Sequence, residues 1–346
     1  MKKIVFAVLL VCTVGIVVYL CSAKSDKPVE QQGFYMGTII SERVSGHNAK
    51  KAADQAMEEI KRLEGLMTIN ANDSEIDKLN AAAGKNPVKL SKESMYVLKT
   101  ALKYAGLSNG AFDVTVGPLV KTWGVFTDHP RVPAQNEINN LLKLVNYRDV
   151  QIDQTNGTAA LRNPGQIVDL GGIAKGYAGD AVIDIYKKNG IKSAYIDLGG
   201  NVVVLGSKPD GSPWRVGIQN PRAPTGKYIG ILNVTNKAVV TSGDYERYFE
   251  MDGKRYHHIL DPHTGYPSNS GLISTTIITD SSTEADALST ATFVLGLEKG
   301  KKLVESLKGV EAVFITADKK IYITKGLKNI FTFDDESKEY TYVQEG

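Results

Sequence analysis

The chain has 346 residues, a length that suits one large domain or two of ordinary size. Hydrophobic residues make up 42% and glycines number 33, which is typical of a globular, loop-rich α/β or α+β protein. The formal net charge is +3, and without Lys2 and Lys3 the remainder has 39 basic and 38 acidic residues. Nucleic acid is therefore not an expected partner, because no basic stripe is visible.

The N-terminus predicts export or membrane anchoring. Lys2 and Lys3 precede eighteen uncharged, mostly apolar residues, 4–21, enough for an export signal or a spanning helix. Cys21 stands where a lipoprotein signal places its acylated cysteine, although Leu20 precedes it, so a lipid anchor and an uncleaved helix both stay open. Either places the body on the extracytoplasmic side of the membrane, periplasmic or at the cell surface. We expect an anchor over 1–21 and a polar, flexible tether over 22–32.

The first part of the body predicts a strand and three helices. Residues 33–40 open the body as a strand. Residues 47–67 place small and apolar side chains on one face, as an amphipathic helix does. A polar loop over 68–80 passes into a short helix. Ser91 is the expected N-cap of a helix that runs to Ala105.

A loop rich in Gly and Pro follows at 110–120 and carries the pair Phe112-Asp113. It either lines a site or is a simple strand entry. A short helix is expected over 136–145. A hairpin over 150–161 turns at Asn156-Gly157.

The central stretch is 168–180, which predicts the end of a strand, a glycine turn and a helix. Gly171 and Gly172 allow positive φ and close approach of a ligand. Lys175 in the first turn and the unpaired N–H groups of a helix N-terminus suit an anion such as phosphate. An ordinary strand–helix connection is the alternative interpretation, since the sequence matches no phosphate-binding or dinucleotide-binding motif. The apolar residues that recur at helical spacing are Ile173, Tyr177, Ala181 and Ile185.

The second half predicts mainly strands. A hairpin turn is expected at Asp252-Gly253, an apolar helix over 284–295 and an acidic, loosely held tail over 334–346. The expected strands lie at 193–206 as a pair, 214–219, 228–234, 237–240, 273–279, 310–316 and 320–324.

Asp286 and Thr290 lie four residues apart, so both side chains leave one face of the expected helix. A carboxylate on an otherwise apolar helix needs a partner or a cation, and oxygen ligands of this kind suit Mg²⁺. The alternative is that Asp286 is a first-turn residue favoured by the helix dipole. His257, His258 and His263 fit no zinc spacing, and one of them acting as a general base is the better functional hypothesis. A structural histidine beside the Asp261-Pro262 turn is the alternative.

The chain contains a series of short motifs, which in sequence order are Met36-Gly37-Thr38, 73–80, 110–115, Trp123-Gly124, 168–180, 198–201, 214–216, 241–245, 258–267 and 285–291. In this order they resemble the ApbE-type flavin transferases, which are FAD:protein FMN transferases. The resemblance covers residues 33 to about 333. It implies an α+β fold of mixed sheets with flanking helices, related to the T-fold, as one catalytic domain over 33–333.

The resemblance also implies a reaction. FAD binds with Mg²⁺ at its diphosphate, a Thr or Ser hydroxyl of an acceptor flavoprotein subunit attacks the FMN phosphorus, and AMP leaves. His258 matches the proposed base, and a neutral imidazole near pH 7 suits that role. The residues that match the metal ligands are Gly172 (by its carbonyl), Asp286 and Thr290. The residues that match FAD contacts are Met36, Ala111, Phe112, Asp113 and Asp169, and Lys175 suits the diphosphate.

One position departs from the family. Where many members place a Tyr against the flavin nucleotide, this chain has Asn70. An Asn cannot stack on the ring system, but its carbonyl can approach a metal or hold a water. This opens FAD hydrolysis to FMN and AMP as a second function. A non-catalytic FAD-binding lipoprotein is a third, although His258 argues against it because binding alone needs no base.

Overall fold

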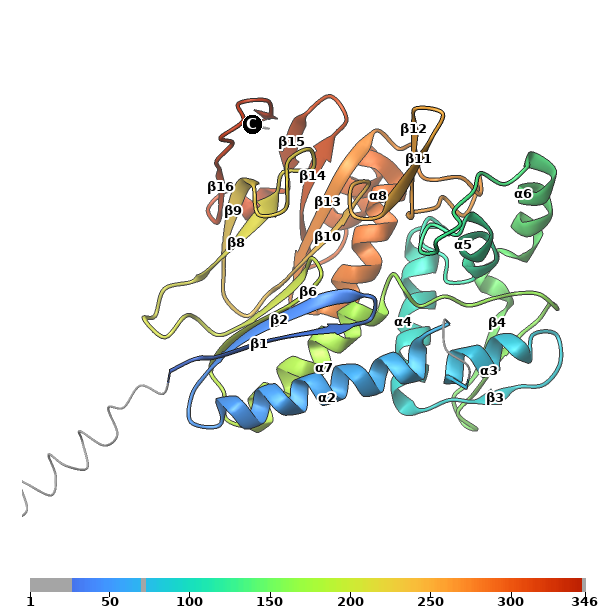
Figure 1. Cartoon of the computed structure of the whole chain (residues 1–346), viewed down its shortest axis with the longest axis horizontal. Helices are drawn as coiled ribbons and strands as arrows, with labels where there is room; N and C mark the ends of the chain where they lie inside the picture. Colours follow the sequence, from blue (N-terminus) through green and yellow to red (C-terminus); the bar gives the residue numbers. More distant parts are fainter. Residues whose placement is uncertain (1–26, 70–72, 344–346) are drawn as a thin grey trace, which may run out of the picture.

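The computed structural model describes residues 27–69 and 73–343. Its centre is a nine-stranded sheet in the order β1-β2-β6-β7-β10-β13-β14-β15-β17 (Figure 1). Neighbouring strands are antiparallel except β15 and β17, which run parallel. These strands are β1 (Val29–Tyr35), β2 (Thr38–Ser45), β6 (Ser193–Leu198), β7 (Asn201–Leu205), β10 (Ala238–Gly243), β13 (Leu272–Thr279), β14 (Glu311–Thr316), β15 (Lys320–Ile323) and β17 (Thr341–Tyr342).

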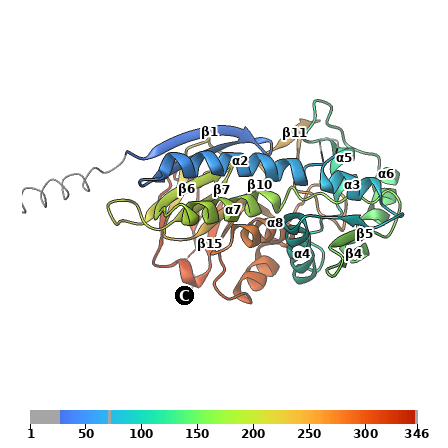
Figure 2. The same cartoon turned by 90° about the horizontal axis from the view of Figure 1, so that it is seen from below.

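Helices cover one face of this sheet. α2 (Ala49–Met67) packs on β1 and β2, α7 (Ala174–Lys188) on β6 and β7, and α8 (Ser282–Glu305) on β10 and β13 (Figure 2). α2 also packs against α7, and α7 against α8. The largest hydrophobic core lies under these three helices.

A small sheet covers part of the other face. It has the order β16-β9-β8 and forms a second core against the outer side chains of β13 and β14. β13 is consequently buried along its whole length, with Ile277 in the first core and Ile278 in the second. The strands of the small sheet are β8 (Trp214–Gln219), β9 (Tyr228–Val234) and β16 (Phe331–Phe333).

The remaining elements lie outside the two sheets and three helices described above, and among them α4 packs against α8. The helices are α3 (Glu75–Ala81), α4 (Lys92–Leu107), α5 (Gly117–Trp123) and α6 (Gln135–Leu141), with short 3₁₀ turns at Leu142–Leu144, Tyr147–Asp149 and Lys325–Leu327. The strands are β3 (Val88–Lys89), β4 (Val150–Asp153) and β5 (Thr158–Leu161) in one sheet and β11 (Tyr248–Met251) with β12 (Lys254–His257) in a hairpin. A third small core joins α5 and α6 to the segment after β12 through Leu119, Trp123, Ile138 and Leu260.

One acidic side chain lies inside the main core. Glu42 on β2 is 1% exposed and contacts the Tyr186 hydroxyl of α7 and the Gln31 amide of β1. Burial raises the pKa of Glu42 to about 7, because the charged form loses its hydration. This carboxyl is therefore protonated more readily in the folded chain than in the unfolded chain.

Several expectations for the ends of the body need correction. The tether was expected to reach Gln32, but β1 begins at Val29, so 29–32 belong to the sheet. Residues 33–40 were expected to form one strand. They instead form the end of β1, a turn at Met36 and Gly37, and the start of β2. The expected loose tail is docked at its far end, where Tyr340 is buried, its hydroxyl donates to Asn220, and β17 pairs with β15.

The central stretch also differs from its prediction. No strand leads directly into Gly171: β5 ends at Leu161, and between it and Gly171 the backbone makes one isolated bridge, from Ile167 to Val116. Neither Gly171 nor Gly172 has a positive φ, so this turn does not use the conformational freedom that the sequence offers. The helix does form. Of the expected apolar residues, Ile173 is buried, and Tyr177 and Ala181 pack partly buried against the core. The fully buried positions within the helix are Gly176, Ala178, Gly179, Val182, Ile183 and Tyr186.

The N-terminal anchor, residues 1–21, lies outside the described residues. Among residues 27–69 and 73–343, no helix is both long enough and apolar enough to cross a bilayer.

Candidate active site

The first turn of α7 meets the second turn of α8. The backbone N–H of Gly176 donates to Oδ2 of Asp286 at 2.8 Å, and Lys175 Nζ lies 3.8 Å from Oδ1. Asp286 is only 3% exposed. Since α8 begins at Ser282, Asp286 lies beyond the first turn of α8. The dipole of α8 therefore does not account for the burial of this carboxylate. It instead occupies part of the N-terminus of α7, where a carboxylate is favoured.

Two glycines allow this close approach. A Cβ on Gly176 would lie 2.3 Å from the carbonyl oxygen of Ser282 and 2.7 Å from Cβ of Asp286. A Cβ on Gly179 would lie 2.9 Å from the Ser282 hydroxyl oxygen. Real Cβ contacts are essentially never this short, so only glycine lets α7 and α8 pack at this distance.

Asp180 fixes the start of α8 from the neighbouring helix. Its Oδ1 accepts from the backbone N–H of Ser282 at 2.7 Å, and its Oδ2 accepts from the N–H of Thr283 at 2.9 Å. The hydroxyls of Ser281 and Thr283 also donate to Oδ2. The carboxylate therefore caps α8 in trans and holds its first turn against α7. Asp180 is the last residue of the 168–180 stretch, and no sequence pattern predicts this role for it.

Gly172 and Thr290 lie beside this contact. A Cβ on Gly172 would lie 3.4 Å from Thr290 Oγ1 and 3.1 Å from the Phe112 ring. Thr290 Oγ1 is 3.5 Å from Ser242 Oγ, which in turn lies 2.8 Å from Ser289 Oγ. The structure thus brings together the three residues expected to bind the metal and Phe112, which come from three separate segments.

The donor set suits Mg²⁺ chemically. A carboxylate, a hydroxyl and a backbone carbonyl are all oxygen ligands, the kind that Mg²⁺ takes. Within 27–69 and 73–343, no group of three or more His, Cys, Asp or Glu side chains gathers in metal-binding geometry. The protein therefore offers one carboxylate here, which fits an ion that shares its coordination with substrate phosphates and water.

The side chain of Asp113 fixes the conformation of the 110–115 loop by hydrogen bonds. Asp113 Oδ1 accepts from the N–H and hydroxyl of Thr115 at 2.8 and 2.6 Å, and Oδ2 accepts from the N–H of Tyr147 at 2.8 Å. Burial raises the pKa of Asp113, although these donors oppose the shift. Both carboxylate oxygens are thus engaged by the protein, so Asp113 shapes the loop that presents Ala111 and Phe112.

Asp169 is tied to the same loop. Its backbone N–H donates to the Val114 carbonyl at 2.7 Å, and its Oδ1 accepts from the Gly171 N–H at 2.8 Å. Burial raises the pKa of Asp169, and the charges of Lys121 and Lys175 act in the opposite direction. The 110–115 loop and the central stretch therefore form one connected wall.

Met36 occupies the turn between β1 and β2 with a φ of +51°. Its N–H donates to Glu64 Oε1 on α2 at 2.7 Å, which offsets part of the cost of this left-handed backbone. In the same turn, the Gly37 carbonyl accepts from the Arg247 guanidinium. The hairpin turn is therefore held from α2 on one side and from the segment before β11 on the other.

His258 follows β12, and its side chain is oriented by Arg247. Nδ1 lies 3.2 Å from the Arg247 carbonyl oxygen, which can only accept, so Nδ1 carries the proton and Nε2 has the free lone pair. Burial lowers the pKa of His258 to about 3, and the charge of Lys175 acts in the same direction. The imidazole is consequently neutral at pH 7, the protonation state in which Nε2 can accept a proton.

The other two histidines have structural surroundings. His257 is buried, with Nε2 3.0 Å from the Ser268 carbonyl oxygen, and its ring packs edge-on against Phe293. His263 contacts Asp261 Oδ1 through Nδ1 and the Asn109 carbonyl through Nε2. These contacts agree with the structural interpretation for these two residues. Asn70 lies outside the described residues.

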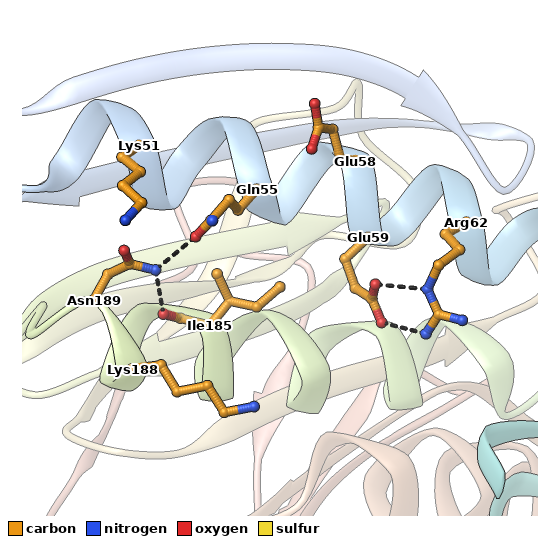
Figure 3. Close-up of a pocket in the computed structure, with 8 residues that line it drawn as sticks. All are labelled: Lys51, Gln55, Glu58, Glu59, Arg62, Ile185, Lys188 and Asn189. Carbon is orange, nitrogen blue, oxygen red and sulfur yellow. Dashed lines mark hydrogen bonds and ion pairs between the residues drawn. The ribbon is translucent and has the colours of Figure 1, made fainter.

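A separate groove lies away from the candidate residues. This groove has a volume of about 560 Å³ and lies between α2 and α7. Figure 3 shows the Asn189 amide within it, where the amide donates to Gln55 and to the Ile185 carbonyl. Arg62 pairs with Glu59 at its far end. None of the candidate residues lines this groove.

Comparisons with known proteins agree on one family. The model of the ApbE family matches residues 36–314. A Klebsiella pneumoniae protein named FAD:protein FMN transferase is 37% identical over 289 residues, which is 84% of this chain and 89% of that protein. A Treponema pallidum protein of the same name is 36% identical over 309 residues, covering 84% and 85%.

Solved structures are similar over nearly the same span. The ApbE protein of Thermotoga maritima superposes with a TM-score of 0.82 at 36% identity, covering 88% of this chain and 99% of that one. The flavin transferase ApbE of Vibrio cholerae gives a TM-score of 0.79 at 30% identity, with coverage of 88% and 99%. The predicted α+β fold of mixed sheets with flanking helices is confirmed.

Proposed function

The chain belongs to the ApbE family and is an FAD:protein FMN transferase, and we propose that it acts with Mg²⁺ on a Ser or Thr hydroxyl of an acceptor flavoprotein subunit. The observation that carries the mechanism is the meeting of α7 and α8. There the buried Asp286, the cation Lys175, Thr290 and Gly172 come together. This is an arrangement for holding a diphosphate and the charge that neutralises it.

The reaction balances as a phosphoryl transfer. The acceptor oxygen forms a bond to the FMN phosphorus while the bond from that phosphorus to the bridging diphosphate oxygen breaks. The bridging oxygen leaves with AMP, and FMN becomes a phosphoester of the acceptor. The hydroxyl proton goes to Nε2 of His258. The FMN phosphate and the leaving group therefore need electrostatic support from the protein.

Lys175 supplies part of that support. It lies in the first turn of α7, and its charge reaches the carboxylates of Asp286 and Asp169 as well as His258. One N–H of the helix N-terminus, that of Gly176, is already bound by Asp286. We therefore assign diphosphate binding to the ammonium of Lys175 more than to the helix N-terminus.

Asp286, Thr290 and the Gly172 carbonyl are the groups that would hold Mg²⁺. When bound, the ion would offset the negative charge of the diphosphate and of the AMP leaving group. Asp286 would stay oriented for this role because Gly176 donates to its Oδ2, while Ser242 lies beside Thr290.

His258 would act as the base. Its Nδ1–H points to the Arg247 carbonyl, so Nε2 faces away from that contact with its lone pair available.

We assign FAD contacts to Met36, Ala111 and Phe112. Asp113 and Asp169 hold the wall of the site that carries these residues. Sequence evidence for residues 1–21 supports a membrane-anchored, extracytoplasmic enzyme.

The test uses the purified chain with FAD and Mg²⁺. Membranes from the source organism, prepared after deletion of this gene, supply acceptor without flavin. We expect AMP release together with covalent protein-bound flavin, seen as fluorescence in a denaturing gel, and we expect chelation of Mg²⁺ to stop both. AMP release at the same rate without membranes, with no labelled protein, would instead indicate hydrolysis.

A further inference from the structure

Two large apolar side chains project into solvent beside the candidate site. Phe34 on β1 is 70% exposed and Ile39 on β2 is 64% exposed, the two largest exposed fractions among the large hydrophobic residues described. They are directly paired across the β1–β2 ladder. Paired residues lie on the same face of a hairpin, so the two form one apolar surface.

A third exposed apolar side chain lies against the base. Phe126 is 48% exposed, and its ring meets the imidazole of His258 edge-on at a centroid distance of 5.6 Å. The Arg247 guanidinium lies 5.2 Å from the centre of the same ring. Phe126 therefore lies directly beside the imidazole to which we assign the base role.

Arg247 joins the two places. Its guanidinium contacts the Phe126 ring and donates to the Gly37 carbonyl in the turn that follows Phe34 and precedes Ile39. Its own carbonyl accepts from His258. We call three exposed residues the apolar rim: Phe34, Ile39 and Phe126. Arg247 contacts both the turn between Phe34 and Ile39 and the Phe126 ring, so the rim residues lie around one arginine.

The sheet edge beside the rim suits an extended polypeptide. Within the described ranges, the nine-stranded sheet ends at β1, so the outer edge of β1 has no strand partner there. Such an edge can take an extended chain by main-chain hydrogen bonds, with apolar neighbours giving selectivity. A flavin nucleotide has no such backbone to offer.

We propose that the apolar rim docks the acceptor segment, with apolar side chains that flank the Ser or Thr seated on Phe34, Ile39 and Phe126. The inference rests on the proposed function and adds to it the chemistry of the partner: an extended stretch with apolar residues next to the hydroxyl. The acceptor is the occupant that has to reach His258, which a second copy of this chain or a lipid surface does not.

The proposal separates acceptor binding from FAD binding. Phe34 and Ile39 are surface residues, and neither belongs to or packs against the three hydrophobic cores of the described residues. Replacing both by serine removes the apolar surface without opening a cavity. We expect the FAD affinity and the thermal unfolding midpoint to stay unchanged, and acceptor labelling to slow.

The experiment compares four proteins in the membrane labelling assay. The double variant Phe34→Ser with Ile39→Ser is expected to label the acceptor about tenfold more slowly or worse at limiting membrane concentration, the loss that follows from losing burial of two such side chains. The conservative pair Phe34→Leu with Ile39→Val is expected to label at close to the wild-type rate. Tyr228→Ser is the control, since it removes an exposed aromatic from β9 in the small sheet.

Each outcome decides something different. Slow labelling by the double serine variant, with normal FAD affinity, supports the rim. Labelling at the wild-type rate by that variant overturns the rim and leaves the proposed function intact. Equal slowing by Tyr228→Ser also overturns it, because the effect would not be local. No labelled protein with the wild-type chain would refute the proposed function itself.

Discussion

Gly176→Ala tests whether the contact between α7 and α8 builds the site. The added Cβ would lie 2.3 Å from the Ser282 carbonyl oxygen, where ordinary contacts begin at 3.4 Å, so the helices have to separate by about 1 Å. Overpacking of this kind costs roughly 1–3 kcal/mol. Stretching the bond from the Gly176 N–H to the Asp286 carboxylate adds up to roughly 1.5–3 kcal/mol.

A matched control isolates this contact. Gly65 also lies in a helix, α2, and a Cβ there meets no described atom within 4 Å. Both substitutions gain about 0.5–1 kcal/mol from replacing a helical glycine by alanine. The difference between the two variants in free energy of unfolding therefore reports the α7–α8 contact.

Denaturant unfolding and the membrane labelling assay measure the two consequences. We expect Gly65→Ala to be as stable as wild type or slightly more stable, and fully active. We expect Gly176→Ala to be less stable than Gly65→Ala by at least about 1 kcal/mol, and to lose most transfer because Asp286 moves. A Gly176→Ala protein that matches Gly65→Ala in both measurements would refute the reasoning.

Three further predictions concern single side chains. Asp286→Asn keeps an acceptor for the Gly176 N–H but removes the charge, so we expect unchanged thermal unfolding, turnover lower by roughly 10²-fold or more, and no response to added Mg²⁺; turnover that still rises with Mg²⁺ to the wild-type level would exclude the metal assignment. His258→Gln is expected to keep FAD affinity and lose transfer by roughly 10²–10⁴-fold. Because the pKa of His258 is about 3, wild-type transfer should show no acid limb from this residue between pH 7 and pH 5, and a limb that His258→Gln abolishes would contradict this. The pKa of Glu42 is raised to about 7 on folding, so its contribution to stability is full below pH 4.5 and is lost as the pH rises through 7; urea unfolding of Glu42→Gln should lack this part of the pH dependence, and an identical pH profile would disprove the shift.

Local patterns predicted most of the secondary structure. Ser91 does cap α4, accepting from the Ser94 N–H, and Asn156-Gly157 does turn the β4–β5 hairpin. The strands expected at 214–219 and 228–234 have the same bounds as β8 and β9. These features depend on residues close together in sequence, which is why periodicity and turn chemistry are enough to find them.

The contacts that build the site could not be predicted in this way. The face of α7 was expected at Ile173 and every fourth residue, but Gly176 and Gly179 make its closest approach because α8 packs there. Asp180 acts across about a hundred residues of sequence on the start of α8. Such pairings follow from the tertiary packing of two helices, and nothing in either helix alone identifies them.

The candidate site residues came from the family resemblance rather than from pattern. The structure adds a structural role for two of them, because Asp113 accepts from Thr115 and Tyr147, and Asp169 accepts from the Gly171 N–H. Arg247 was missed altogether, although it contacts Gly37, Phe126 and His258. A lone arginine between two short strands carries no sequence signal that distinguishes it from any other surface cation.

Peptide mass mapping of the labelled acceptor tests the central claim most directly. After incubation with FAD and Mg²⁺, we predict one acceptor peptide whose mass rises by that of FMN less one water, with the added group on a Ser or Thr oxygen and one AMP released for each label. AMP release without any such peptide, or flavin attached through a residue other than Ser or Thr, would contradict the account.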